Sequence, residues 1–445
     1  MSKLPGINHL RAVAALEKAG FRILRQGAHI VMTDGSRILT IPRHNPVNAF
    51  TMGGIVRDAG LSLDAFRKLL QPKSNLAWIH AVVGVDIALE GGYRFKGFDP
   101  EASGIVLLCP QEVVLKILRI AVPVLCFSAM VSFSAAQQAR LLVAQKGEQS
   151  LGIIDPLAGT VIASVPEGGT TGHEVVASPD GRLAYVPIYG NSGVGMPGTD
   201  GGNMVVIDIA AQKVVGNLDF GRGVRPHMPI FGPKDGLLYV TTELDRSISV
   251  IDPKTLKIVG SIPTGQPESH MLALSHDGQR GYTANVGPGT VSVLDIPGRR
   301  VVEVIPISSN TQRISISNDD RWVFTSDQSK PQLAVIDART NEVSRWIPLE
   351  GLGYGTAPTP DGRWLLVTMP ASNKVAVVDL KTMQVVRTVE TPVDPEEVLA
   401  QPGGKTAWVS CVKSHTVAEL DLAGWKIKRT ILAGKNSDGI AWAGR

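Results

Sequence analysis

The stretch HMLALSHDGQRGYTANVGPGTVSVLDIPGRRVVEVIPI, residues 270–307, contains four short apolar runs. The runs cover 270–274, 280–284, 290–295 and 301–307, and β-branched residues are frequent in them. Glycine, aspartate and proline fill the gaps, as is typical of strands joined by tight turns. No apolar stripe at helical spacing crosses the stretch. It therefore predicts one sheet of four short strands.

The same pattern fills the C-terminal two thirds of the chain. An aspartate that ends each third run marks the repeat, at Asp155, Asp208, Asp252, Asp295, Asp337, Asp379 and Asp421. Successive marks lie 53, 44, 43, 42, 42 and 42 residues apart. A fixed period of about 40–45 residues with several strands per copy indicates a β-propeller. Because these aspartates recur in every copy, we expect them to serve turns rather than catalysis.

Seven marks predict seven blades. The first mark has strands around it but no innermost strand before it, whereas residues 438–443 form a strand with nothing after it. We therefore expect the C-terminal strand to complete the first blade, because ring closure removes exposed sheet edges.

This region resembles the YVTN family of seven-bladed propellers, which includes YncE-like proteins. The matching pieces are SPDGRLAYV at 178–186, SVIDPKTLKIVGSIPTG at 249–265 and VAVVDLKTMQVVRTV at 375–389. The resemblance covers about residues 139–445 and implies the fold. It implies no particular activity, because one fold hosts many functions.

The residue that opens each innermost strand is expected at one mouth of the central channel. Counting back from the turn after that strand gives one residue per blade: His173, His227, His270, Gln312, Tyr354, Glu396 and Asp438. Three histidines on consecutive blades could bind a transition metal or a redox cofactor. Alternatively, they cap strand starts by hydrogen bonding to neighbouring blades. The propeller ligand, whether a protein or a small molecule, is left open.

A glycine-rich insertion at 190–202 explains the 53-residue step. It lies between the second and third strands of its blade, so we expect it to overhang the same mouth. A lactonase-like hydrolase using Glu396 and Arg313 is a further alternative, although no lactonase motif accompanies them. The propeller is accordingly interpreted first as a non-enzymatic binding platform.

The first seventy residues predict a separate small α+β domain of order α-β-β-β-α(α). Helical spacing precedes Gly20, three strands follow at 21–26, 29–33 and 37–41, and helices follow at 51–58 and 62–70. Asp34-Gly35 predicts a hairpin turn and Ser62 a helix N-cap. Ten Lys/Arg against four Asp/Glu give this segment a charge of +6, which favours a polyanionic partner or simply a soluble basic surface.

This segment resembles the HicA family of toxin mRNA interferases, which have a double-stranded-RNA-binding-like fold. The residues that carry the resemblance are LPGINHLRAVAALEKAGFRILRQGAHIVM at 4–32, ILTIPRH at 38–44 and TMGGIVRDAGLSLDAFRKLL at 51–70. It implies an endoribonuclease with RNA as substrate, a HicB-like antitoxin as partner and His29 as the catalytic residue. A histidine near neutral pKa suits the proton transfers of RNA cleavage. Arg25, Arg37, Arg43 and His44 are candidate RNA contacts.

The two domains are separated by a linker at 71–112 and by a segment at 113–136 that has the shape of a signal peptide. Lys116 and Arg119 precede an apolar run that ends in small residues. In one interpretation, the segment anchors a fusion protein in a membrane, with the first domain cytoplasmic and the propeller outside. Alternatively, the natural exported protein begins near Val113 and the first domain is an extension or an inactive remnant.

Overall fold

In the computed structural model of the chain, residues 7–27, 29–43, 47–70, 85–87, 93–95 and 138–444 are described. The predicted linker at 71–112 lies almost entirely outside them, as does the whole signal-like segment at 113–136. The chain divides into two compact units, Met1–Ser128 and Ala129–Arg445. No helix in the described ranges has the length and apolar character needed to cross a membrane.

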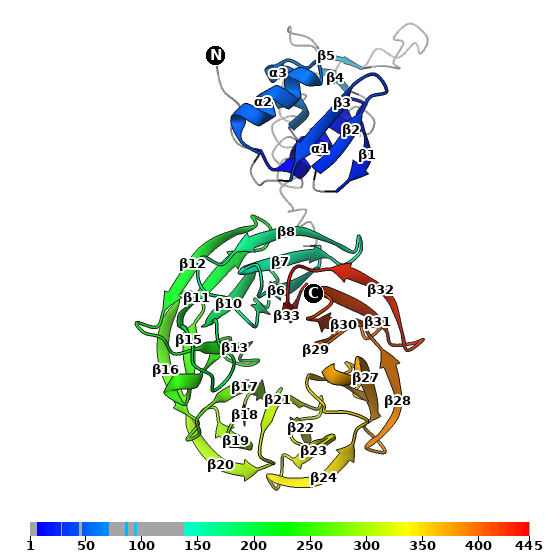
Figure 1. Cartoon of the computed structure of the whole chain (residues 1–445). Coiled ribbons are helices and arrows are strands. Elements are labelled where there is room, and N and C mark those ends of the chain that lie inside the picture. The colour runs from blue at the N-terminus through cyan, green and yellow to red at the C-terminus, as the bar shows by residue number, and fades with distance from the viewer. Residues whose placement is uncertain are drawn as a thin grey trace, which may run out of the picture. The chain divides into compact units, whose positions relative to one another are not determined.

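The first unit has the element order that the sequence predicts. Its elements are α1 (His9–Lys18), β1 (Arg22–Gln26), β2 (His29–Thr33), β3 (Ile38–Pro42), α2 (Ala49–Asp58) and α3 (Leu63–Leu70), followed by β4 (Val85–Ile87) and β5 (Tyr93–Phe95). The three strands form one antiparallel sheet in the order β1-β2-β3 (Figure 1). One face of that sheet joins the helices in a single buried core, because alternate residues such as Ile30, Met32 and Ile41 point into it.

Local signals fix the ends of these elements. Gly20 follows α1 with a φ of 95°, and Gly35 turns the β2–β3 hairpin with a φ of 96°. Ser62 Oγ accepts a hydrogen bond from Ala65 N at 3.1 Å, as an N-cap does. These three turn and cap predictions are therefore confirmed.

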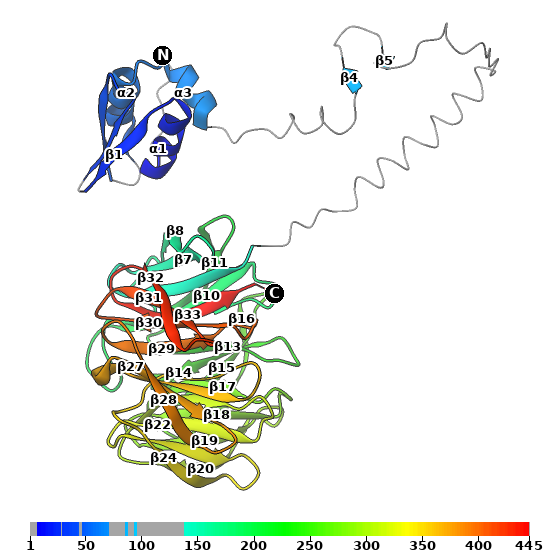
Figure 2. The same cartoon turned by 90° about the vertical axis from the view of Figure 1, so that its right-hand side faces the viewer.

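The second unit is a β-propeller, so the mainly β prediction for this region is confirmed. Over residues 138–444 seven four-stranded sheets surround a common axis (Figure 1), and Figure 2 views the same ring from its edge. We number these blades by strand order. Blade 1 holds β33 (Ser437–Ala443), β6 (Arg140–Gln145), β7 (Ser150–Asp155) and β8 (Thr160–Pro166).

The other blades follow the chain. Blade 2 is β9 (Val176–Ala177), β10 (Leu183–Gly190), β11 (Asp200–Asp208) and β12 (Lys213–Asp219); blade 3 is β13 (Pro226–Phe231), β14 (Leu238–Thr242), β15 (Ser247–Asp252) and β16 (Lys257–Pro263); blade 4 is β17 (Ser269–Leu274), β18 (Arg280–Asn285), β19 (Thr290–Asp295) and β20 (Arg300–Pro306). Blade 5 is β21 (Thr311–Ile316), β22 (Trp322–Asp327), β23 (Gln332–Asp337) and β24 (Glu342–Pro348); blade 6 is β25 (Thr356–Pro358), β26 (Trp364–Met369), β27 (Lys374–Asp379) and β28 (Gln384–Glu390); blade 7 is β29 (Pro395–Ala400), β30 (Thr406–Cys411), β31 (Thr416–Asp421) and β32 (Lys426–Leu432). Short 3₁₀ turns, η1 (Glu243–Asp245) and η2 (Pro370–Ser372), join the second and third strands of blades 3 and 6.

The ring closes where the sequence predicts. Strand β33 pairs antiparallel with β6, with Trp442 opposite Leu141 and Ile440 opposite Val143. Ile440 is buried in a cluster with Trp408 and Val417 of blade 7. Each pair of neighbouring blades shares one such apolar cluster, so the core is a ring of sheet-to-sheet interfaces.

The repeating aspartates serve turns, as predicted. Each ends the third strand of its blade, and its carboxylate accepts hydrogen bonds from backbone N–H groups two or three residues later. The fourth residue after each aspartate has a positive φ, at Gly159, Gln212, Leu256, Arg299, Asn341, Met383 and Trp425. A shared hairpin geometry therefore explains why the aspartate repeats.

Candidate functional site

The predicted mouth residues lie where the innermost strands begin. In five blades a β-bulge precedes the regular pairing, because two residues of the innermost strand face one residue of its neighbour. In blade 5, for example, Thr311 pairs with Asp327 and the next pair is Ile314 with Thr325. The bulge breaks the alternation of faces, so two successive residues per blade can approach the axis.

The three histidines come together. The ring centroids of His173 and His227 are 5.7 Å apart, and those of His227 and His270 are 3.6 Å apart in a stacked arrangement. The ring centroid of Tyr189, on β10, lies 4.7 Å from that of His173 and 5.7 Å from that of His270. The structure therefore brings the rings of His173, His227 and His270 together.

Burial lowers the pKa of all three imidazoles. It brings the pKa of His173 to about 3 and holds those of His227 and His270 below the usual value. The histidines are therefore neutral at pH 7 and keep a nitrogen lone pair. The Nδ1 atom of His227 is buried and has no hydrogen-bond partner among the described residues.

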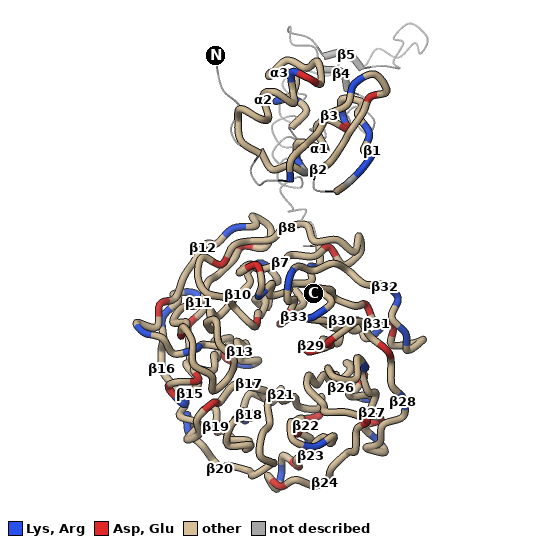
Figure 3. Tube along the Cα trace, viewed as in Figure 1, with Lys and Arg blue, Asp and Glu red and all other residues tan. Residues whose placement is uncertain are grey.

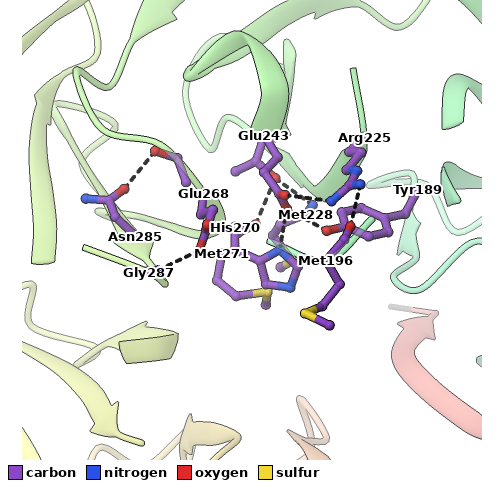
Figure 4. Close-up of polar contacts among 12 residues, drawn as sticks. Tyr189, Met196, Arg225, Met228, Glu243, Glu268, His270, Met271, Asn285 and Gly287 are labelled. Atoms are coloured by element: carbon purple, nitrogen blue, oxygen red, sulfur yellow. Dashed lines mark hydrogen bonds and ion pairs between the residues drawn. The ribbon is translucent and has the colours of Figure 1, made fainter. Parts of the chain in front are cut away.

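Glu243 orients His270. Its Oε2 atom lies 3.3 Å from His270 Nδ1 and accepts a hydrogen bond from Tyr189 Oη at 2.6 Å, while Arg225 Nη1 donates to Oε1 at 3.3 Å (Figure 4). Burial alone would raise the pKa of Glu243, but the hydrogen bonds from His270 and Tyr189 and the charge of Arg225 bring it below the usual value. Glu243 is thus an ionised acceptor, so His270 carries its proton on Nδ1 and its lone pair on Nε2.

The other half of the mouth is acidic and is crossed by Arg313. Its Nη1 donates to Glu174 Oε1 at 2.7 Å and to Glu397 Oε2 at 3.2 Å, and Nη2 lies 3.7 Å from Asp438 Oδ1. These partners belong to blades 2, 7 and 1, so one guanidinium links four blades. Figure 3 shows the acidic stretch of β29 at the inner edge of the ring.

Further predicted mouth residues surround this ion pair. Tyr354 lies under the Arg313 guanidinium, with its ring centroid 5.0 Å from Cζ. Lys146 Nζ contacts Asp438 Oδ2 at 3.0 Å. Burial, reinforced by Asp438, raises the pKa of Glu396 to about 7. Gln312 lies half-buried on β21.

The geometry of the mouth can be compared with the metal site and the lactonase-like site that the sequence suggests. A metal held by all three histidines does not fit, because the described residues contain no group of three His, Cys, Asp or Glu side chains placed as metal ligands. The stacking of His227 on His270 explains this, since parallel rings do not aim their nitrogens at one ion. Arg313, considered together with Glu396 for a lactonase-like reaction, is instead engaged by Glu174 and Glu397.

The glycine-rich insertion contacts the histidine half of the mouth through Arg225. Residues 191–199 connect β10 to β11, and the carbonyl of Met196 accepts a hydrogen bond from Arg225 Nη2 at 2.7 Å. A pocket of about 460 Å³ lies beneath the loop, lined by Gly195, Met196, Pro197, Arg225, Glu243, Leu244, Arg246, Pro267 and Glu268.

In the first unit, the predicted RNA-binding residues separate into two groups. His29 is exposed at the start of β2 opposite Pro42, so it shares one end of the sheet with Arg43 and with Arg25 near the end of β1. Arg37 lies at the other end of the sheet, where Nη1 donates to Ala59 O at 2.7 Å and faces Asp34 at 3.8 Å. His44 lies outside the described residues. The structure therefore brings Arg25, His29 and Arg43 toward one another but not Arg37.

Sequence reasoning missed Tyr189, Arg225 and Glu243, and it did not identify Glu174 and Glu397 as channel residues. Arg225 stands two residues before His227, and Glu174 and Glu397 directly follow predicted mouth positions. A rule that allowed two inward residues at each predicted mouth position would have found the last two. Tyr189 comes from the end of β10 and Glu243 from η1, directly after β14, and neither carries a periodic signal.

Comparisons with known proteins support the propeller. A family model described as Cytochrome D1 heme domain matches residues 231–361. No curated protein matches the chain, and the comparisons give no support to the HicA resemblance. Among solved structures, hydrazine synthase of Kuenenia stuttgartiensis is similar with a TM-score of 0.54 and 20% identity, covering 64% of this chain and 92% of that chain. At that identity the likeness shows the fold alone: this chain contains a β-propeller similar to the one in that enzyme.

Proposed function

We propose that the propeller holds a redox cofactor of the heme class at the histidine half of its mouth, with His270 as the ligand. The match to a heme-domain family model supports this, and of the three clustered histidines only His270 lies within the matched residues 231–361. A bound heme would supply reversible one-electron transfer.

The observation that carries the proposal is the contact between Glu243 and His270. Histidines that bind metals usually donate their second N–H group to a carboxylate or carbonyl, which fixes the ring and raises its basicity. Glu243 accepts such a hydrogen bond from Nδ1 of His270, and the lowered pKa of His270 keeps the imidazole unprotonated at Nε2. A single ligand of this kind needs no second histidine on the same ion, so it agrees with the stacked rings.

The neighbouring side chains would serve the bound group in distinct ways. His227 and Tyr189 would exclude water from the ligand, since both are buried against it. Glu174 and Glu397, paired with Arg313, would place a buried charged network on the opposite side of the axis. Burial raises the pKa of both carboxyls, so this network can hold a proton at a higher pH than a solvent-exposed glutamate does.

The test is titration of the purified full-length chain with hemin, followed by its Soret absorption. The wild type should give a shifted Soret band that His270→Ala loses. His276→Ala is the matched control, because His276 is exposed, pairs with Asp320 and lies outside the mouth. Circular dichroism should show both variants folded. Equal spectra for wild type and His270→Ala, or no shift for the wild type, would reject the proposal.

For the first unit we infer an RNA-cleaving role, supported by the exposed His29 near Arg25 and Arg43 on one end of the sheet. The test is cleavage of a single-stranded RNA by the full chain and by His29→Ala, with Arg57→Ala as a control that changes a basic residue of α2. Cleavage that survives His29→Ala would remove His29 from the role. Export of the propeller stays a prediction, to be tested by sequencing the mature N-terminus from the native host.

A further inference from the structure

Arg225 joins the insertion loop to the carboxylate that orients His270. Its Nε donates to Asp200 Oδ1 at 2.7 Å and its Nη2 donates to Met196 O at 2.7 Å, both on the loop side. Its Nη1 donates to Glu243 Oε1 at 3.3 Å. One guanidinium thus bonds with the loop on two edges and with Glu243 on the third.

The contact between Arg225 and Glu243 is buried and fixed in geometry. Arg225 is 6% exposed and Glu243 is 2% exposed, so neither can turn freely into water. A guanidinium fork uses fixed donor directions, and charge-assisted bonds to buried carboxylates are stronger than neutral ones. A change in the position of Met196 or Asp200 therefore changes the position of the guanidinium, and with it the position of Glu243.

The ends of the loop are pinned, so motion is directed to its tip. A Cβ on Gly201 would lie 1.7 Å from Ile188 O, and Gly190 has a φ of 128° with Thr199 O 2.1 Å from its Cβ position. Asn191 Oδ1 accepts a hydrogen bond from Thr199 N at 2.7 Å, which closes the base. Between these points, the tip around Met196 is held to the ring by Arg225.

We propose that Arg225 is a positioning residue that couples the 191–199 loop to His270 through Glu243. With the loop seated, Glu243 accepts a hydrogen bond from Nδ1–H of His270 and the Nε2 lone pair is presented to a ligand. With the loop tip displaced, Arg225 follows Met196, the hydrogen bond from His270 to Glu243 weakens, and the imidazole can take the other tautomer. The change of the His270 tautomer follows from contacts within this chain alone, whereas the effect of that change on a bound heme rests on the proposed function.

The experiment compares the full-length wild type with Arg225→Ala, Arg225→Lys and Asp200→Asn. Asp200→Asn weakens the loop side only, because Glu243 keeps its contact with Arg225. Arg222→Ala is the matched control: Arg222 stands three residues earlier and pairs with Asp245, and it does not contact Glu243. Arg225→Ala is first checked for an unchanged circular dichroism spectrum.

Two readouts do not need a cofactor. The ¹⁵N resonances of the His270 ring, assigned by their loss in His270→Gln, should report a proton on Nδ1 in the wild type and in Arg222→Ala. They should shift toward a mixture of tautomers in Arg225→Ala and, less far, in Asp200→Asn and Arg225→Lys. Amide exchange at 192–198 should speed up in the same order.

A third readout is the affinity for hemin. Loss of an outer-shell partner typically weakens metal binding by about 10- to 100-fold, and we expect Arg225→Ala in that range with Arg222→Ala unchanged. If the wild type binds no hemin while the tautomer still shifts, the proposed cofactor is wrong and the coupling stands. If His270 keeps one tautomer in Arg225→Ala while the loop exchanges faster, the coupling is refuted.

Discussion

Glu167 should make the stability of the propeller depend on pH. This side chain lies in the connection between β8 and β9 and is 2% exposed. Its Oε2 accepts a hydrogen bond from Gly172 N at 2.9 Å, whereas Oε1 has no partner among the described residues. Burial, only partly offset by that bond, raises the pKa of Glu167 from 4.5 to about 7. The folded protein therefore holds a proton that the unfolded chain releases.

The sign and size follow from this difference. The folded state binds the proton more tightly, so its contribution to stability is fully present below pH 4.5 and is lost as the pH rises through about 7. The full loss is at most about 3 kcal/mol, most of it between pH 5 and pH 8. For a domain of this size that corresponds to a fall in melting temperature on the order of 5 °C.

Glu167→Gln provides the test, because the amide is neutral at every pH and keeps the acceptor for Gly172 N. Calorimetry at pH 5 and pH 8 should show a smaller fall for this variant than for the wild type. Glu342→Gln, an exposed change on β24, controls for general charge effects. An equal fall in wild type and Glu167→Gln would show that Glu167 ionises normally in the fold, against the reasoning given.

Three further outcomes follow from the fold. Ile440→Ala should destabilise the closed ring by about 2–5 kcal/mol, because it leaves a cavity between blades 1 and 7; a melting temperature no lower than that of the half-exposed Ile162→Ala would contradict the closure energetics. Gln212→Gly should leave stability unchanged or raise it by up to about 1 kcal/mol, because Gln212 is exposed with a φ of 55°; a clear loss in denaturant midpoint would argue against strain at that turn. Arg37→Ala should lower the stability of the first unit by about 1 kcal/mol through its bond to Ala59 O, whereas His29→Ala should not; equal urea midpoints for the two variants would contradict a structural role for Arg37.

The propeller could be predicted from the sequence because the signals for its strands and turns are local and repeated. Each copy carries one turn aspartate, such as Asp252 or Asp295, with the same turn chemistry. The strands between such turns can bury their apolar faces only against neighbouring blades. Strand β33 was predictable for the same reason, since the first blade lacked an inner strand. The position of His270 followed from counting along that repeat.

The chemistry of the mouth was less predictable. A bulge at the start of β21 turns Arg313 as well as Gln312 toward the axis, and alternation of strand faces does not foresee that. Glu243, in η1 of blade 3, meets His270, in β17 of blade 4, only because the two neighbouring blades pack together, and the two residues are 27 positions apart in the sequence. Such contacts depend on tertiary geometry, so residue types and spacing alone did not reveal them.

Because β33 closes the ring, it also determines when the mouth of the channel can form. Asp438, which binds Lys146 and faces Arg313, belongs to β33, and every other strand of the ring precedes β33 along the chain. During translation, blades 2 to 7 can therefore emerge and pair while blade 1 still lacks its inner strand. Until β33 has been synthesised, Lys146 lacks the carboxylate that it contacts, whereas Arg313 keeps Glu174 and Glu397, so the charge network of the mouth is complete only after the ring has closed.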